Sequence, residues 1–137
     1  RKLYASRNLA IKKAKGYFIS FLDIDDTWEK NKLNLQVQKI VKSNSDVCFT
    51  NHWIENKGKK IFKKNINSIN IFDQILTDYP ISILTVLMKK KIFTNFKYHF
   101  DSDYEIIGDF DLFFRLFKLQ DIKLRIYITK SNMERAG

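Results

Sequence analysis

Hydrophobic and polar positions alternate along the chain with periods that predict helices and strands in turn. Residues 3–15 carry apolar side chains on one side and lysines on the other, which predicts an amphipathic helix with Gly16 as its C-cap. Residues 17–22 then form an almost unbroken apolar run, typical of a strand covered on both faces. A helix that leads directly into a buried strand indicates an α/β fold.

The segment after residue 30 predicts another helix and further strands. Helical spacing of apolar residues places this helix at 31–43. The positions that we expect to face the core are Leu33, Val37, Ile40 and Val41. A short apolar strand follows at 46–51, and two short strands around a turn at 56–58 predict a β-hairpin.

The remaining pattern adds elements that complete one domain. We expect a short helix at 69–76, an apolar strand at 81–88, a helix at 109–119 and a closing strand at 123–128. With 137 residues, the chain is long enough to bury a core, and its length predicts a single domain over residues 1–137.

Composition excludes several classes of protein. Hydrophobic residues make up 45% of the chain, which excludes a disordered tail. The single cysteine, Cys48, excludes an internal disulfide, and its apolar neighbours predict an ordinary buried thiol in a reducing compartment. No apolar run reaches the roughly 18 to 20 residues that span a bilayer, and the basic start of the chain is not a signal peptide. We therefore expect a cytoplasmic protein.

The net charge of +10 calls for an anionic partner or surface. Lysines gather in three clusters, at residues 12–15, 57–64 and 89–91. Such clusters are either solvated faces or a means of holding a protein at an anionic membrane, here the inner face of the plasma membrane. Aromatic side chains are not interleaved with these lysines as stacking platforms for bases would be, so a nucleic-acid-binding module is the weaker alternative.

The strongest chemical signal is an acidic turn at the end of the first predicted strand. Asp23, Asp25 and Asp26 follow the apolar run directly. Ligands of α/β folds bind outside the carboxyl ends of the strands, and carboxylate oxygens are suitable ligands for a hard divalent cation. The turn therefore predicts a place where a phosphate group and a cation meet.

Taken alone, residues 21–27 resemble the first motif of the haloacid dehalogenase phosphatases, an apolar strand followed by Asp-x-Asp-x-Thr. That resemblance implies that Asp23 is the nucleophile and forms an aspartyl phosphate, with Asp25 as the acid and base. A magnesium-dependent phosphatase is therefore one alternative.

The wider context resembles the family 2 glycosyltransferases. Residues 5–10 hold a small residue followed by Arg-Asn, and residues 14–28 hold Ala-x-Gly, an apolar strand, the Asp-x-Asp-Asp turn and a tryptophan. Lys-Leu at 32–33 continues this signature, and residues 108–116 are similar to the family's acidic pair with its following Asp-Leu and Arg-Leu. A phosphatase explains neither the upstream helix nor the later block. The resemblance implies a GT-A fold with a mixed, mostly parallel sheet flanked by helices.

The family resemblance also implies a reaction and its residues. A sugar would pass from a nucleotide-diphosphate sugar to a hydroxyl of a glycan or lipid-linked acceptor with inversion, in bacterial surface polysaccharide or lipopolysaccharide synthesis. Asp25 would bind Mg²⁺ or Mn²⁺ at the diphosphate, and Asp23 would contact the ribose or the metal shell. Asp26 would either support that site or cap the turn. Asp109 would accept the acceptor's proton as the catalytic base.

Some positions depart from the family pattern. Gly108 stands where a glutamate is common, which removes a possible contact to the acceptor. Asp111 suits the first turn of a helix or an ion pair with Arg115 four residues later. The resemblance also implies that nucleotide-binding strands belong before residue 1, so we expect a partial catalytic domain, incomplete at its N-terminus and poorly active alone.

Overall fold

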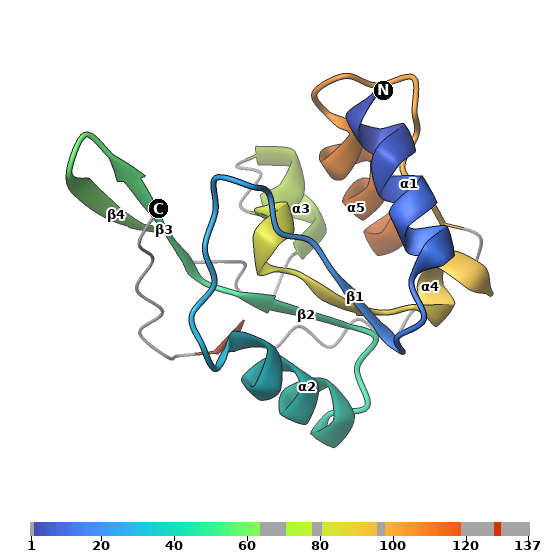
Figure 1. The fold of residues 1–137 in the computed structure, drawn as a ribbon, viewed down its shortest axis with the longest axis horizontal. Coiled ribbons are helices and arrows are strands. Elements are labelled where there is room, and N and C mark those ends of the chain that lie inside the picture. The colour runs from blue at the N-terminus through green and yellow to red at the C-terminus, as the bar shows by residue number, and fades with distance from the viewer. Residues whose placement is uncertain (1, 64–70, 78–80, 96–97, 119–127, 130–137) are drawn as a thin grey trace.

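A four-stranded sheet with helices on both sides organises the computed structural model (Figure 1). The structure describes residues 2–63, 71–77, 81–95, 98–118 and 128–129. The strands of the sheet lie in the order β1 (Phe18–Ser20), β5 (Leu87–Lys89), β2 (Val47–Thr50) and β6 (Ile128–Thr129). The predicted closing strand at 123–128 lies outside the described residues except for its last position, which belongs to β6.

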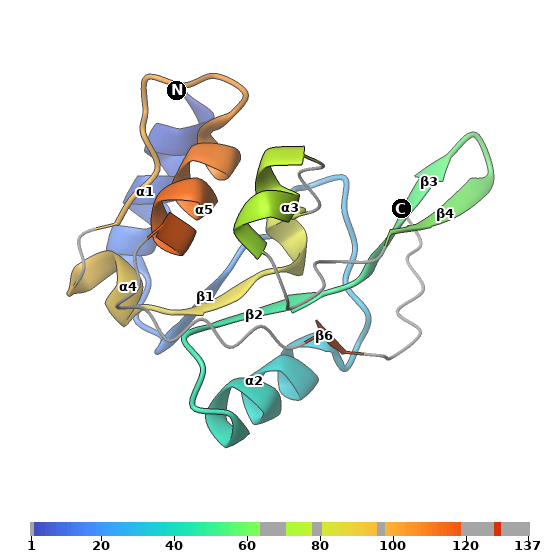
Figure 2. The same cartoon turned by 180° about the vertical axis from the view of Figure 1, so that it is seen from behind.

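Helices cover the two faces of this sheet unequally. Figures 1 and 2 show α2 (Lys32–Lys42) on one side and α1 (Leu3–Lys13), α3 (Ile71–Thr77) and α5 (Gly108–Lys118) on the other. A short helix, α4 (Lys91–Thr94), follows β5 beside α1. Within the described residues, no helix is both long enough and apolar enough to cross a membrane.

The directions of the strands differ from the prediction. β5 runs antiparallel to both β1 and β2, whereas β2 and β6 pair in parallel. The prediction of a mostly parallel sheet is therefore wrong for the described strands, although β1 and β2 do run in the same direction. An apolar run indicates that both faces of a strand are covered, but it does not encode the direction in which the chain crosses the sheet.

The apolar segment predicted as one strand at 81–88 contains two elements. A 3-10 helix, η1 (Ile83–Thr85), comes before β5. Its turn is closed by Thr85, whose backbone nitrogen and hydroxyl both donate to the carbonyl of Ser82, at 2.9 and 2.6 Å. Both elements are buried, which explains why their sequence has no helical or strand period.

The buried face of α1 also differs from the expected one. Tyr4, Arg7 and Ile11 are its buried residues, at spacings of one helical turn, whereas Leu3 is half exposed. The helix ends at Lys13, with Ala14 as an extended C-cap, so Gly16 lies beyond the cap and does not close the helix. An arginine at the centre of the buried face hides the true period of this helix.

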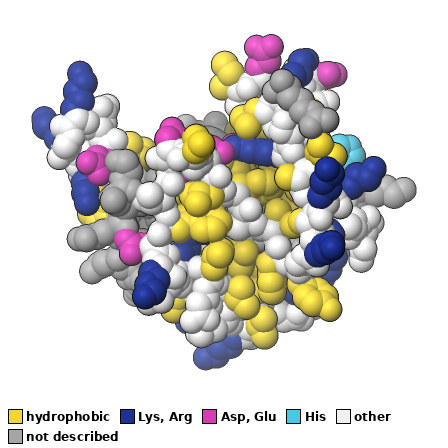
Figure 3. Space-filling model, in the orientation of Figure 1, with side chains coloured by type: hydrophobic (Ala, Val, Ile, Leu, Met, Phe, Trp, Pro, Cys, Tyr) yellow, Lys and Arg dark blue, Asp and Glu magenta, His cyan; other side chains and the backbone are white. Residues whose placement is uncertain are grey.

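Helix α2 turns part of its apolar stripe toward solvent. Ile40 is buried as expected, but its buried neighbours are Lys32 and Gln36, while Leu33 is 40% and Val41 65% exposed. Figure 3 shows hydrophobic side chains at the surface on the side of β1 and α2. The expectation that Leu33 and Val41 face the core is therefore wrong, because the buried face of α2 carries Gln36, which donates to backbone carbonyls under the helix, and Lys32, which donates to Gln36.

The predicted hairpin is confirmed. β3 (His52–Asn56) and β4 (Lys59–Lys63) pair antiparallel, and Asn56 lies opposite Lys59. The two turn residues between them have φ values of +50° at Lys57 and +76° at Gly58. Positive φ at both positions is the requirement of the two-residue turn that matches strand twist, and Gly58 meets it without a steric cost. Figure 1 shows the hairpin extending away from the sheet.

The core lies mainly between the sheet and the helices α1, α3 and α5. Phe49 of β2 packs against Phe113 and Phe117 of α5, with ring centroids 5.9 and 6.0 Å apart. This packing fixes α5 relative to β2. Cys48 is a fully buried thiol that forms no disulfide, as predicted.

Candidate active site

The acidic turn follows β1 after two further residues. A hydrogen bond of 3.1 Å from the backbone nitrogen of Asp26 to the carbonyl of Asp23 closes the turn. The Asp23 side chain is 45% exposed, Asp25 is exposed and Asp26 is partly buried. All three predicted acids therefore lie on one short turn at the carboxyl end of the strand.

Arg7 joins this turn to the second predicted acid. Its Nη1 donates to Asp109 Oδ1 at 2.7 Å, and its Nη2 donates to Asp23 Oδ1 and Oδ2 at 3.0 and 3.2 Å. The arginine is only 8% exposed, and it lies 16 residues from Asp23 and 102 residues from Asp109 in the chain. Asp23 and Asp109 thus share one guanidinium group, and α1, β1 and α5 meet at this point.

Aromatic rings surround the Arg7 guanidinium. Its Cζ atom lies 5.6 Å from the ring centroid of Tyr4, 5.8 Å from that of Phe21 and 5.7 Å from that of Phe100. Cation–π attraction partly replaces the water that the buried cation has lost. Because the rings also restrict the rotamers of Arg7, the two carboxylates are held in a fixed relation.

Asn8, the residue after Arg7, anchors the loop that carries Phe100. Its Nδ2 donates to the Phe100 carbonyl at 2.7 Å, and its Oδ1 accepts from the Phe100 backbone nitrogen at 2.9 Å. These two hydrogen bonds satisfy both the backbone N–H and the backbone carbonyl of Phe100. The Arg-Asn pair of the sequence therefore has two roles, one toward the acids and one toward the loop.

Burial raises the pKa of the Asp109 carboxyl above its usual value. The charge and the hydrogen bonds of Arg7 lower this pKa in part, and the nearby charge of Asp23 raises it. A carboxylate with a raised pKa is a better proton acceptor than an ordinary aspartate. The environment of Asp109 is therefore suited to a general base.

Gly108, which opens α5, lies against the ring of Tyr4. A Cβ atom at this position would come within 2.5 Å of Tyr4 Cε2, a distance that non-bonded carbon atoms do not adopt. Tyr4 cannot easily yield, because it is fully buried and its hydroxyl donates to the Ile106 carbonyl at 2.7 Å. The tyrosine ring thus fills the space that a side chain at 108 would need.

Asp111 and Arg115 form the ion pair that their spacing predicts. Arg115 Nε and Nη2 donate to Asp111 Oδ2 at 2.9 and 2.7 Å, and Nη2 also donates to the His99 carbonyl at 2.7 Å. Asp111 is therefore engaged within the helix, and Arg115 ties this pair to the loop at His99.

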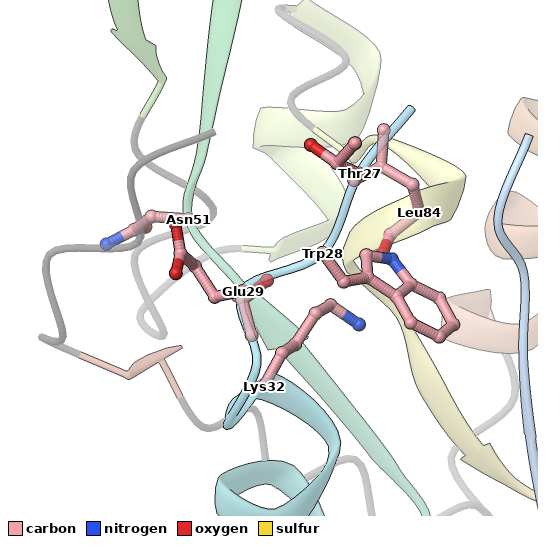
Figure 4. A pocket seen from close by; sticks show the side chains of 7 residues that line it. Thr27, Trp28, Glu29, Lys32, Asn51 and Leu84 are labelled. Carbon is pink, nitrogen blue, oxygen red and sulfur yellow. The ribbon is translucent and has the colours of Figure 1, made fainter. Parts of the chain in front are cut away.

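A buried lysine supports the turn from the other side. Trp28 Nε1 donates to the Leu84 carbonyl at 3.0 Å, and the Lys32 ammonium lies 4.3 Å from the Trp28 ring centroid (Figure 4). Lys32 is 2% exposed and donates to Gln36 Oε1 at 2.8 Å, and Gln36 in turn donates to backbone carbonyls of Cys48 and Thr85. This network ties the end of the acidic turn to α2 and β2, and thereby makes Trp28 a packing anchor.

The acids fit a divalent cation that is shared with a diphosphate. Within the described residues, no group of three or more His, Cys, Asp or Glu side chains could hold a metal ion unaided. Mg²⁺ and Mn²⁺ at nucleotide sites need only one or two carboxylates, with phosphate oxygens and water completing the shell. Asp25 offers an exposed carboxylate, whereas both oxygens of Asp23 already accept hydrogen bonds from Arg7. The donor set therefore favours Asp25 as the direct ligand.

Comparison with known proteins identifies the family. Residues 1–123 match the model of Glycosyl transferase family 2, so the chain belongs to this family. The matched residues include both predicted motif blocks, at 5–33 and 108–116, so the phosphatase alternative is dropped.

Curated relatives agree with this assignment. Over 95 residues the chain is 33% identical to the E. coli UDP-Glc:alpha-D-GlcNAc-diphosphoundecaprenol beta-1,3-glucosyltransferase WfgD, covering 69% of this chain and 38% of WfgD. It is 28% identical over 88 residues to the putative teichuronic acid biosynthesis glycosyltransferase TuaG of Bacillus subtilis, covering 63% of this chain and 35% of TuaG. The chain thus spans less than half the length of the curated relatives it matches.

Solved structures support the fold. S. aureus TarS residues 1–349 superpose with a TM-score of 0.67 at 20% identity, covering 97% of this chain and 40% of that one. The same protein in complex with UDP-GlcNAc gives a TM-score of 0.66 at 19% identity, with coverage of 95% and 40%. The expected glycosyltransferase fold is confirmed, with the correction to strand direction given above.

The sequence motifs identify the acids but not the residue that joins them. The Arg-Asn motif alone assigns no role to Arg7 or Asn8, and the apolar pattern of the helix does not single out Tyr4. The available signal was the spacing of Tyr4, Arg7 and Ile11, which places one arginine among the buried residues of a helix. A buried arginine requires carboxylate partners, and the two acidic motifs were the candidates.

Proposed function

We propose that this chain carries the catalytic acids of an inverting glycosyltransferase that moves a sugar from a nucleotide-diphosphate sugar to an acceptor hydroxyl. Family membership supports the reaction class. The name of WfgD, a UDP-glucose-dependent enzyme that acts on a diphosphoundecaprenol carrier, favours a UDP-sugar donor and a lipid-linked acceptor. The role of TuaG favours bacterial surface polysaccharide or lipopolysaccharide synthesis.

The observation that carries the proposal is the Arg7 bridge. It holds the donor-side acid, Asp23, and the acceptor-side acid, Asp109, on one buried guanidinium group. A displacement with inversion requires the leaving diphosphate and the attacking hydroxyl on opposite sides of one carbon atom. Two acids fixed relative to each other by a caged arginine support such an arrangement.

Asp109 acts as the base in this proposal. Its carboxylate accepts the proton of the acceptor hydroxyl as that oxygen attacks the sugar. The hydrogen bond from Arg7 orients Asp109 Oδ1, and Oδ2, which accepts no side-chain hydrogen bond within the described residues, is the proposed acceptor of the proton. The pKa raised by burial increases the basicity of this oxygen relative to an exposed aspartate.

Asp25 and Asp23 act on the donor. Asp25 would hold Mg²⁺ or Mn²⁺, which would supply positive charge to offset that of the departing diphosphate. Asp23, fixed by Arg7, accepts a hydrogen bond from the ribose. Asp26 supports the turn through its backbone bond to Asp23 and remains the third candidate of this site.

The chain also fits a partial catalytic domain. It covers 38% of WfgD and 40% of TarS residues 1–349. We expect the 137 residues alone to turn over donor slowly and to bind nucleotide weakly. Rapid turnover by these residues alone would contradict this part of the proposal.

Calorimetric titration of UDP into the protein and its variants, with and without Mn²⁺, tests the roles of Asp23 and Asp25 in donor binding. Asp25→Asn should abolish the gain in UDP affinity that Mn²⁺ gives, whereas Asp111→Asn, a matched loss of one carboxylate, should preserve it. Asp23→Asn should weaken UDP binding with or without the metal. A metal-dependent affinity that survives Asp25→Asn would remove Asp25 from the site.

A further inference from the structure

We infer that a lysine-lined groove at the end of β1 away from the acidic turn is a docking surface for an anionic membrane. The groove has a volume of about 580 Å³ and lies between the segment before β1 and the segment from β5 to α4. Its lining residues are Lys15, Gly16, Tyr17, Phe18, Lys89, Lys90, Lys91 and Thr94. A second hollow of about 240 Å³, which shares Lys90 and Thr94, adds Lys12 and His99.

The charge of this surface is one-sided. Neither hollow is lined by an aspartate or a glutamate. Asp46 pairs with Lys89 and Lys91 at 3.2 and 2.9 Å, so five lysines against one carboxylate leave four net positive charges. Figure 3 shows Lys and Arg side chains gathered over α1 and α4. Such a field attracts an anionic surface over a distance of about one Debye length, roughly 8 to 10 Å.

The lysines differ in how they are held by the rest of the protein. Lys90 donates through its ammonium group to the Ala14 carbonyl and through its backbone nitrogen to the Tyr17 carbonyl, the latter at 2.7 Å. These bonds hold the rim of the groove in shape. Lys12 and Lys15 form no ion pair with any part of the chain that the structure describes. Their charges are therefore available to an external partner.

Tyr17 distinguishes a membrane from a soluble anion as the partner. Its side chain is 90% exposed although its backbone is held by Lys90. An aromatic ring with a hydroxyl group, held in water beside lysines, matches the boundary between lipid headgroups and acyl chains, where tyrosine is enriched. A free phosphate or nucleotide would use the charges but leave this ring without a role.

The inference extends the proposed function, because a lipid-linked acceptor lies in a membrane. Tyr17 and Asp23 are connected by a short segment that contains β1, so the acidic turn lies within roughly 20 Å of the proposed membrane surface. The test below uses no sugar donor. Its result therefore stands apart from the outcome of the transfer reaction.

Co-sedimentation of the 137-residue chain with vesicles measures the docking directly. We expect binding to vesicles of phosphatidylcholine that contain about 30% anionic phosphatidylglycerol, and little binding to vesicles of phosphatidylcholine alone. The double variant Lys12→Gln/Lys15→Gln should bind about 25-fold more weakly, because each basic residue near an anionic surface contributes about fivefold. Tyr17→Ser should weaken binding further without a change of charge.

The hairpin offers a matched control. Lys57→Gln/Lys60→Gln removes the same charge from another lysine cluster and should weaken vesicle binding less than about fivefold. Circular dichroism verifies that every variant is folded. Equal losses for the two double variants would overturn the inference, as would equal binding to neutral and anionic vesicles. Binding of inorganic phosphate, or of a duplex DNA probe, that depends on Lys12 and Lys15 while vesicles are not bound would also overturn it.

Discussion

Arg7 and Asp109 are joined by a hydrogen bond of 2.7 Å although 102 residues separate them in the chain. The same guanidinium group binds Asp23, so one side chain from α1 fixes the end of β1 and the start of α5. Because the arginine is buried among three rings, it holds this arrangement before any ligand arrives. The site is thus preorganised by a residue that need not itself touch the substrate.

Replacement of Arg7 should destabilise the fold. Arg7→Met keeps most of the packing of the side chain but leaves two carboxylates facing each other, which should cost about 2 to 3 kcal/mol of unfolding free energy after solvent screening at half-exposed Asp23. Urea unfolding measures the change. Lys12→Met, on the exposed side of the same helix, is the control and should change stability by less than about 0.5 kcal/mol. Equal effects of the two variants would contradict the assigned bridge.

The titration of Asp109 should occur above the usual range of an aspartate. Burial raises its pKa, so its carboxyl carbon signal in ¹³C NMR should titrate at a pH above about 3.9. Because the pKa of Asp109 is higher in the folded than in the unfolded state, the native state keeps the proton to a higher pH. The contribution of Asp109 to the free energy of unfolding therefore falls as the pH rises between the two pKa values. Arg7→Met should raise this pKa further. A titration below the usual value would contradict the dominance of burial.

Gly108 should tolerate no side chain while Tyr4 is present. In an ordinary helix Gly→Ala stabilises by about 0.5 to 1 kcal/mol, but here the new Cβ would overlap the Tyr4 ring, and overpacking costs about 1 to 3 kcal/mol. Thermal unfolding of Gly108→Ala, Tyr4→Ala and the double variant measures the coupling. The alanine at 108 should cost less, or should stabilise, once the ring is removed. Additive effects would show that the two residues do not compete for space.

Cys48 should be unreactive in the native protein. Burial raises the pKa of its thiol to about 11, so little thiolate exists at neutral pH. A thiol-specific reagent such as DTNB should label the folded chain much more slowly than the chain in urea. Labelling at equal rates would mean that the strand β2 opens readily.

The sequence predicted the chemistry of this protein better than its geometry. The acidic turn, the ion pair of Asp111 with Arg115 and the hairpin at Gly58 were all predictable, because each depends on residues close together in the chain. The pairing of Gly108 with Tyr4 was not, since it depends on a contact across the fold. A hydrophobic pattern assigns the wrong face of α1 to the core, because the buried centre of this helix is an arginine, which such a pattern counts as exposed.

The direction of β5 shows a second limit of the same kind. Leu87 and Met88, the last residues of the apolar run predicted as a strand, are buried in β5, which lies between β1 and β2. Strand direction depends on the path of the preceding segment, and local periodicity contains no information on that path. In α2, likewise, Gln36 is buried because its side chain donates to the backbone carbonyls of Cys48 and Thr85, which lie 12 and 49 residues away in the chain.

The most direct test of the account is sugar transfer by the full-length protein from a UDP-sugar in the presence of Mn²⁺, with Asp109→Asn compared with Asp111→Asn. Both variants exchange one carboxylate for an amide in the first turn of α5. Asp109→Asn should lower the rate of transfer by about 10² to 10⁴ while UDP affinity is kept, because only the base is lost. Asp111→Asn should stay within a few-fold of the wild type. Transfer that survives Asp109→Asn, or that fails equally in both variants, would contradict the assignment of Asp109 as the base.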